Sequence, residues 1–145
     1  MSPKRDDLFQ KKNGRIEDFN FGEKTAEVFD DMIERSVPFY NEVQRMIGEM
    51  AADFAVPGTN LYDLGCSTGN TFVRIAPLIP EGVTFIGIDS SEAMLVRAKE
   101  KLTEHEVTRP YKLICLDLNQ GVNVVNASVV IMNLVLQFIR PLYRA

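Results

Sequence analysis

The segment 63–70, DLGCSTGN, contains the residues of this chain whose types and spacing are best suited to holding a ligand. Gly65 permits a tight turn, Gly69 permits close packing of the next helix, and Ser67 is small enough to leave room against the backbone. The spacing lacks the second glycine of the dinucleotide motif G-x-G-x-x-G, and no P-loop lysine follows. The segment therefore predicts a turn that accommodates a nucleoside-like molecule, with an ordinary tight turn as the alternative.

Four short, nearly continuous apolar runs must position this turn. They span residues 60–64, 83–89, 111–118 and 127–138, and such runs are typical of parallel strands that are buried on both faces. Helical patterns at 70–79 and 90–102 alternate with them, and Ser90 or Ser91 caps the second. The alternation predicts an α/β, doubly wound, Rossmann-like fold: a parallel sheet with helices on both faces and a ligand site beyond the carboxyl ends of its strands.

Two helices are expected before the first strand, at residues 23–36 and 36–55. Ser36 is the cap candidate of the second helix and Pro38 its first residue. We expect residues 1–20 to be a flexible arm and residues 21–145 to be one domain, with a helical cap at 21–58 and an α/β core at 59–145. The apolar side chains at helical spacing in the second helix are those of Tyr40, Val43, Met46, Ile47, Met50 and Phe54.

The composition narrows the class of protein. With 145 residues and a net charge of -4, the chain is about one domain in size and lacks the excess of cations expected of a direct nucleic-acid binder. No membrane-length apolar run and no signal peptide are apparent, which favours the cytoplasm. Two cysteines in such a chain are expected to be free thiols, with Cys115 in the core. No Cys and His cluster has zinc spacing, so no metal is expected.

The pattern D-x-G-x-S-x-G resembles motif I of the class I S-adenosylmethionine-dependent enzymes. Asp63, Gly65 and Gly69 match that motif, and Ser67 replaces its middle glycine. Asp89 ends the second expected strand, where a carboxylate can accept hydrogen bonds from both ribose hydroxyls of such a cofactor. The alternative role for Asp89 is capping of the helix that follows.

Two further strand ends carry polar candidates. Asp117 is expected beside the adenine, with the backbone of Leu118 next to it, or else it is simply solvated. Asn133 lies in an apolar run and must find hydrogen bonds, either from a ligand or from a backbone turn. His105 is more simply a solvated histidine, and Cys66 has no basic partner near it in sequence that would make it a nucleophile.

The stretches FNFGEKTAEVFDDMIERSVPFY, LYDLGCSTGN, FIGIDSSEAM and VVIMNLVLQFI together resemble the carboxy-S-adenosyl-L-methionine synthases, from about residue 20 to residue 141. The resemblance implies conversion of S-adenosyl-L-methionine and prephenate to carboxy-S-adenosyl-L-methionine and phenylpyruvate. The product serves a partner enzyme that builds 5-oxyacetyl-uridine at the tRNA wobble position. The cofactor contacts implied are Tyr40, Gly65, Cys66, Ser67, Asp89, Ser90, Asp117, Leu118 and Asn133.

The resemblance also implies an unusual chemistry. Loss of a proton from the methyl group beside the sulfonium gives an ylide, which captures the carbon dioxide released by prephenate. The departing hydroxide of prephenate is the implied base, so no catalytic side chain is assigned and the protein mainly positions the reactants and excludes water.

The end of the chain affects this expectation. The chain stops after the fourth expected strand, so the C-terminal strands of the fold and the arginine that clamps the carboxylate are expected to be missing. We therefore expect the fragment to be inactive. We also expect it either to pair through the open strand edge, as in a homodimer, or to be the remnant of a longer chain. Arg35, Arg74 and Arg140 lie in the general region, but none can be assigned as a substitute. The rival functions are an ordinary methyltransferase of a small acceptor and a non-catalytic cofactor-binding module.

Overall fold

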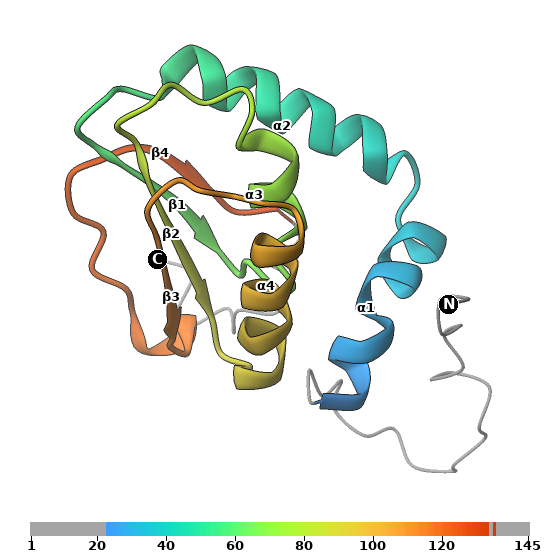
Figure 1. Ribbon diagram of the computed structural model, residues 1–145. Helices are drawn as coiled ribbons and strands as arrows, with labels where there is room; N and C mark the ends of the chain where they lie inside the picture. Colours follow the sequence, from blue (N-terminus) through green and yellow to red (C-terminus); the bar gives the residue numbers. More distant parts are fainter. Residues whose placement is uncertain (1–22, 134, 136–145) are drawn as a thin grey trace, which may run out of the picture.

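Four parallel strands in the order β3-β2-β1-β4 form the sheet of this protein. A computed structural model describes residues 23–133 and 135 (Figure 1), so the expected N-terminal arm lies outside the described residues. The division into a cap and a core at residue 58 stays a prediction. The elements in chain order are α1 (Glu23–Ser36), α2 (Tyr40–Phe54), β1 (Asn60–Leu64), α3 (Asn70–Ile75), β2 (Thr84–Asp89), α4 (Glu92–Glu104), β3 (Tyr111–Cys115), the 3-10 helix η1 (Leu118–Gln120) and β4 (Ala127–Ile131).

The strand register brings the expected ligand-binding segments to one edge of the sheet. Asp63 pairs with Gly87 between β1 and β2, and Asp89 pairs with Cys115 between β2 and β3. Because all four strands are parallel, the glycine turn after β1 lies beside the end of β2 and the segments that follow β3 and β4. The fourth strand, β4, pairs with β1 on the side opposite β2.

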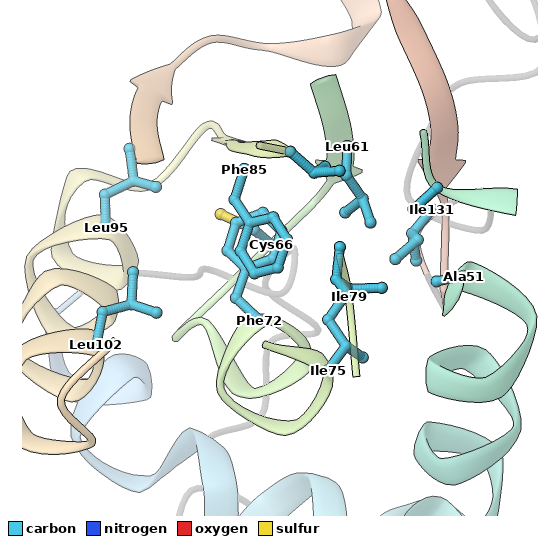
Figure 2. Packing of buried hydrophobic residues seen from close by; sticks show 12 residues of the cluster. Ala51, Leu61, Cys66, Phe72, Ile75, Ile79, Phe85, Leu95, Leu102 and Ile131 are labelled. Atoms are coloured by element: carbon cyan, nitrogen blue, oxygen red, sulfur yellow. The ribbon is translucent and has the colours of Figure 1, made fainter. Parts of the chain in front are cut away.

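The two faces of the sheet are covered differently. Leu61 and Phe85 face α2, α3 and α4, and the ring of Phe85 stacks on Phe72 of α3 with centroids 4.7 Å apart (Figure 2). The other face carries Tyr62, Leu64, Ile86 and Ile88, and the apolar side chains packed against it come from the segment around η1. Helices were expected on both faces. Among the described residues, α2, α3 and α4 cover one face and only the short η1 lies on the other.

The turn after α3 explains why this helix is shorter than expected. Pro77 follows closely and has no N–H to continue the helix. The guanidinium of Arg109 donates hydrogen bonds to the carbonyl oxygens of Ala76, Ile79, Pro80 and Val83 at 2.7 to 3.1 Å. A single side chain from the segment before β3 thus holds the carbonyls of the turn that joins α3 to β2.

The first expected helix is confirmed, because α1 packs against α4 through Phe29 and Met32, which contact Met94. The second begins later than predicted, at Tyr40, with Pro38 in the turn before it and Phe39 as the cap in the left-handed conformation.

The apolar spacing of α2 identified its buried face only in part: Tyr40 is buried and Ile47 packs against the core, but three other residues do not. Its buried residues are Tyr40, Gln44, Gly48 and Ala51, whereas Met46, Met50 and Phe54 are 50%, 61% and 68% exposed. The reason is that Gly48 lets α2 approach α3 closely: a Cβ at this position would lie 3.4 Å from Ile75 of α3 and 3.0 Å from Leu78 in the turn after it. The contact face is therefore set by small residues and one amide instead of by the largest apolar side chains.

Two strands are shorter than their apolar runs. β3 ends at Cys115, so Asp117 lies beyond the strand, and β4 ends at Ile131, so Asn133 lies in a bend after it. Residues 134 and 136–138 of the last expected strand lie outside the described residues. The thiols of Cys66 and Cys115 are free as expected, but Cys115 is exposed on β3 and not in the core.

Candidate ligand-binding site

A cavity of 540 Å³ opens at the carboxyl ends of the strands, between the glycine turn and the helices α1 and α2. It has the size of a small-molecule site. Every residue that the resemblance assigned lies on its wall: Tyr40, Gly65, Cys66, Ser67, Asp89, Ser90, Asp117, Leu118 and Asn133. The structure thus brings all nine together, while their contacts with a cofactor stay a prediction.

The glycine turn has the backbone conformation that its residues suggested. Gly65 and Gly69 have φ angles of 80° and 78°, and Ser67 adopts a φ of 51°, which a side chain rarely does. A Cβ on Gly69 would lie 3.3 Å from Cβ of Ala98, so this glycine permits close contact with α4. The amides of Gly65 and Cys66 both donate to the carbonyl of Ile88, which fixes the turn against β2.

Asp89 holds the turn and the next helix together. Its Oδ2 accepts from the amide of Ser67 at 3.0 Å, and its Oδ1 accepts from the amide of Ser91 at 2.9 Å. Ser91, not Asp89, caps α4 by accepting from the amide of Met94, so the alternative role of Asp89 as helix cap is wrong. A carboxylate offers about four lone-pair positions. The backbone amides of Ser67, Ser90 and Ser91 all hydrogen-bond to this carboxylate, which still leaves an acceptor position for a ligand hydroxyl.

Asp63 is the most perturbed acid of the cavity wall. Its side chain is buried in β1, and burial together with the negative charge of nearby Asp89 raises the pKa of Asp63 to about 7. A cationic group in the cavity would oppose both effects and favour the charged carboxylate. The sequence identified Asp63 only as part of the motif and gave no signal of this perturbed pKa.

Cys66 is buried, and its sulfur lies close to the stacked rings of Phe72 and Phe85 (Figure 2). Burial raises the pKa of the Cys66 thiol, and the charges of Asp63 and Asp89 raise it further. A neutral thiol is a poor nucleophile. Cys66 is therefore a packing residue whose small size suits the turn.

Tyr40 is both a core residue and a wall residue, so the two alternatives for it coincide. Its hydroxyl accepts a hydrogen bond from Nε2 of Gln44 at 3.0 Å, and Oε1 of Gln44 accepts from the hydroxyl of Thr71 at 3.0 Å. Burial raises the pKa of Tyr40. Its neutral hydroxyl therefore keeps its own hydrogen for a further acceptor.

Gln44 and Thr71 also lie on the cavity wall, although neither was predicted from the sequence. The available signal was a polar residue four positions from Tyr40 and four from Gly48, on the face that α2 buries.

The third and fourth strands contribute a more open part of the wall. Asp117 is exposed, yet its Oδ1 accepts from both the amide and the side chain of Asn119 at 2.9 Å and so caps η1. Leu118 packs against the second face of the sheet, and Asn133 is half-buried after β4. Asp117 is thus hydrogen-bonded as well as solvated, and its expected contact with adenine stays a prediction.

The remaining candidates do not extend this site within the described residues. Arg35 and Arg74 are absent from the cavity lining there, and Arg140 lies outside the described part of the chain. Residues 23–133 and 135 contain no group of three or more acidic, His or Cys side chains that could hold a metal ion. In the same residues no helix combines the length and the apolar character needed to cross a membrane.

Comparison with known proteins identifies the family. A family model described as "Methyltransferase domain" matches residues 62–145. The carboxy-S-adenosyl-L-methionine synthase of Methylococcus capsulatus is 52% identical over 97% of this chain and 58% of its own length. The synthase of Shewanella piezotolerans is 39% identical over 99% of this chain and 59% of its own. The chain thus spans somewhat more than half the length of these relatives.

A solved structure supports the fold independently. A candidate S-adenosyl-L-methionine-dependent methyltransferase of Methanococcus maripaludis superimposes with a TM-score of 0.67 at 13% identity, covering 89% of this chain and 57% of that one. The expected Rossmann-like α/β fold and the resemblance to the synthases are therefore confirmed. The chain belongs to the methyltransferase-domain family, and over nearly its whole length it is similar to carboxy-S-adenosyl-L-methionine synthases.

Proposed function

We propose that the cavity binds S-adenosyl-L-methionine and that this chain provides the cofactor-binding part of a carboxy-S-adenosyl-L-methionine synthase. One observation carries the proposal: the nine residues that the resemblance assigned come from separate segments of the chain, yet all lie on the wall of one cavity. The names of the relatives support the same activity.

In this proposal the cofactor extends along the carboxyl edge of the sheet. The adenine lies by Asp117 and Leu118, and the ribose hydroxyls donate to Asp89. The methionine part lies by the glycine turn, where the sulfonium and the ammonium are near Asp63. A cation there is attractive because the buried carboxyl of Asp63 gains a partner for its charge.

The reaction proposed is the transfer of a carboxyl group from prephenate to the cofactor. When bound, the cofactor supplies a methyl group whose protons are acidified by the sulfonium, and prephenate supplies carbon dioxide and hydroxide as it becomes phenylpyruvate. This chain's residues bind and orient the cofactor. The apolar side chains of α1 on the cavity wall, Phe29, Met32 and Ile33, help to exclude water.

The wider role is also a proposal. The product would serve a second enzyme that modifies the wobble uridine of tRNA, in the cytoplasm, and this chain would not itself contact nucleic acid. We further propose a homodimer. Among the described residues β4 lies at one edge of the sheet, next to β1, and it is uncharged and apolar. Such an edge can pair with a strand of a second chain.

A second candidate is a methyltransferase that acts on a small acceptor, and the matched domain family favours it. A third is a cofactor-binding module without activity. The mass of the cofactor product separates them: incubation with S-adenosyl-L-methionine and prephenate should yield carboxy-S-adenosyl-L-methionine if the first proposal is right. S-adenosylhomocysteine that forms only with an acceptor would favour the second, and binding without any product would favour the third.

A further inference from the structure

A buried lysine connects α4 to the glycine turn and to α1. Lys101 is 5% exposed, and its ammonium donates to Oγ1 of Thr68 at 3.0 Å, to Oδ1 of Asn70 at 2.7 Å and to Oδ2 of Asp30. Thr68 belongs to the glycine turn, Asn70 begins α3 and Asp30 lies on α1. One side chain of α4 therefore meets two other segments, α1 and the turn that leads into α3.

Asp30 closes the same group of side chains from the other side. Its Oδ1 accepts from the hydroxyl of Thr68 and from the amide of Asn70, both at 2.8 Å. The side-chain amide of Asn70 thus donates to Asp30 through its nitrogen and accepts from Lys101 through its oxygen, and these two bonds fix its orientation. We name these four residues, Asp30, Thr68, Asn70 and Lys101, the clasp.

The clasp has an electrostatic cost. Burial lowers the pKa of Lys101 despite its contact with Asp30. Burial alone would raise the pKa of Asp30, but the hydrogen bond and charge of Lys101, with the hydrogen bonds from Thr68 and Asn70, hold it below its usual value. An apolar side chain at position 101 would avoid this cost, because buried ion pairs are often no more stabilising than hydrophobic packing. The clasp is therefore better explained by the geometry it imposes.

Two of the residues that Lys101 contacts belong to the cavity wall. Thr68 and Asn70 lie on the cavity wall, and so do Phe29 and Met32, which flank Asp30 on α1. Lys101 does not line the cavity in the described part of the chain. Any effect of Lys101 on a ligand must pass through these neighbours.

We propose that Lys101 is a positioning residue for the ligand site. Through Asp30, Thr68 and Asn70 it holds the glycine turn at a fixed distance from α1 and so determines how tightly the amino-acid end of the cofactor is held. The inference rests on the proposed binding of S-adenosyl-L-methionine. It predicts a selective effect, because the adenosine end is proposed to lie by Asp89 and Asp117, whose side chains accept from Ser67, Ser91 and Asn119 and not from a clasp residue.

The test compares Lys101→Met with Lys99→Met, the same substitution at an exposed position of the same helix. Affinities for S-adenosylhomocysteine and for adenosine are measured by calorimetry on the chain, with circular dichroism and melting temperature as checks on the fold. Lys101→Met should weaken S-adenosylhomocysteine roughly three- to thirty-fold, the range for residues that modulate a site without touching its ligand. The affinity for adenosine should fall much less in Lys101→Met, and Lys99→Met should change neither affinity.

Loss of folding stability alone would not change the ratio of the two affinities, so an equal loss for both ligands, or no loss, overturns the inference. If Lys101→Met does not fold, Asp30→Asn replaces it, since the Asp30 side chain is 42% exposed and the change keeps its shape. The same selective loss is expected, and an unchanged ratio in this variant overturns the inference. If the unaltered chain binds no S-adenosylhomocysteine, the proposed function fails and the inference with it. Binding with an unchanged ratio refutes the clasp's role alone.

Discussion

The two sides of the cavity differ in what holds their side chains in place. The buried wall consists of Tyr40, Asp63, the glycine turn and Asp89. Hydrogen bonds between residues distant in sequence hold it: Ser67 to Asp89, Lys101 to Thr68, and Thr71 to Gln44, which in turn donates to Tyr40. The open wall consists of residues 116–119 and 133, and Asp117 is held only by its neighbour Asn119 among the hydrogen bonds resolved there. The buried wall is thus built before a ligand arrives. The open wall is more exposed and can adapt to the ligand, which suggests that selectivity for the cationic cofactor depends on the buried wall.

The largest expected effect is on the pH dependence of stability, and it comes from Asp63 of the buried wall. The pKa of Asp63 is about 7 in the folded chain against an ordinary value of 3.8. Between these values the folded state keeps a proton that the unfolded state has lost, so the free energy of unfolding falls as the pH rises through this window. The side chain of Asn does not titrate, so Asp63→Asn removes this contribution. The difference in free energy of unfolding, variant minus original chain, should therefore rise by roughly 3 to 4 kcal/mol from pH 4 to pH 8, at about 1.4 kcal/mol per unit of pKa shift.

Urea denaturation at several pH values measures this effect. If the stability difference between the two proteins stays constant from pH 4 to pH 8, the pKa of Asp63 is not raised in the folded chain. The buried wall would then not differ from the open wall in the pKa of its acids.

Two glycines with positive φ angles test the packing of the glycine turn against that of an open turn. A Cβ on Gly69, which has a φ of 78°, would lie 3.3 Å from Ala98, whereas Gly58, in the turn before β1, has a φ of 82° and enough open space that a Cβ there would meet nothing within 4 Å. Gly69→Ala should cost roughly 2 to 3 kcal/mol, because strain from the positive φ and crowding add. Gly58→Ala should cost about 1 kcal/mol from strain alone. Thermal denaturation of both variants measures the difference, and equal losses would contradict the tighter packing of the glycine turn.

Two carboxylates test the contribution of each wall to affinity. Asp89→Ala should weaken S-adenosylhomocysteine by roughly 1.5 to 3 kcal/mol, the usual value of hydrogen bonds to a charged group. Asp117→Ala should weaken it by only about 0.5 to 1.5 kcal/mol, because water and Asn119 compete for the exposed carboxylate. Calorimetry with the fold intact gives both values. If Asp117→Ala costs more than Asp89→Ala, the ligand depends mainly on the open wall.

The smallest effect is expected at Tyr40. Tyr40→Phe should lose about 0.5 to 1.5 kcal/mol of ligand affinity, and some stability as well, because the amide of Gln44 loses its acceptor. A triple variant, Tyr40→Phe with Gln44→Leu and Thr71→Val, removes that unsatisfied amide and also the Thr71 hydroxyl that donates to it. Stability should recover in the triple variant while affinity stays low. Recovery of both quantities would mean that the hydroxyl of Tyr40 serves the core and not the ligand.

The sequence predicted the parts of this architecture that depend on local pattern. Apolar runs located the four strands, and the spacing of Asp63, Gly65 and Gly69 located the turn, because parallel strands bring their carboxyl ends to one edge. The clasp could not be predicted this way: Lys101 and Asp30 are 71 residues apart in sequence and meet only in the folded chain. The prediction of the buried face of α2 failed in part for a related reason, since close approach at Gly48 outweighed the periodicity of larger apolar residues.

The central claim, that this cavity binds S-adenosyl-L-methionine, is tested most directly by titrating the isotope-labelled chain with S-adenosylhomocysteine and following backbone amide chemical shifts. We expect saturable shifts that are largest at residues 65–69, 89–91 and 117–119 and small on the exposed face of α2. Absence of saturable shifts, or shifts that are largest away from these three segments, would contradict the claim.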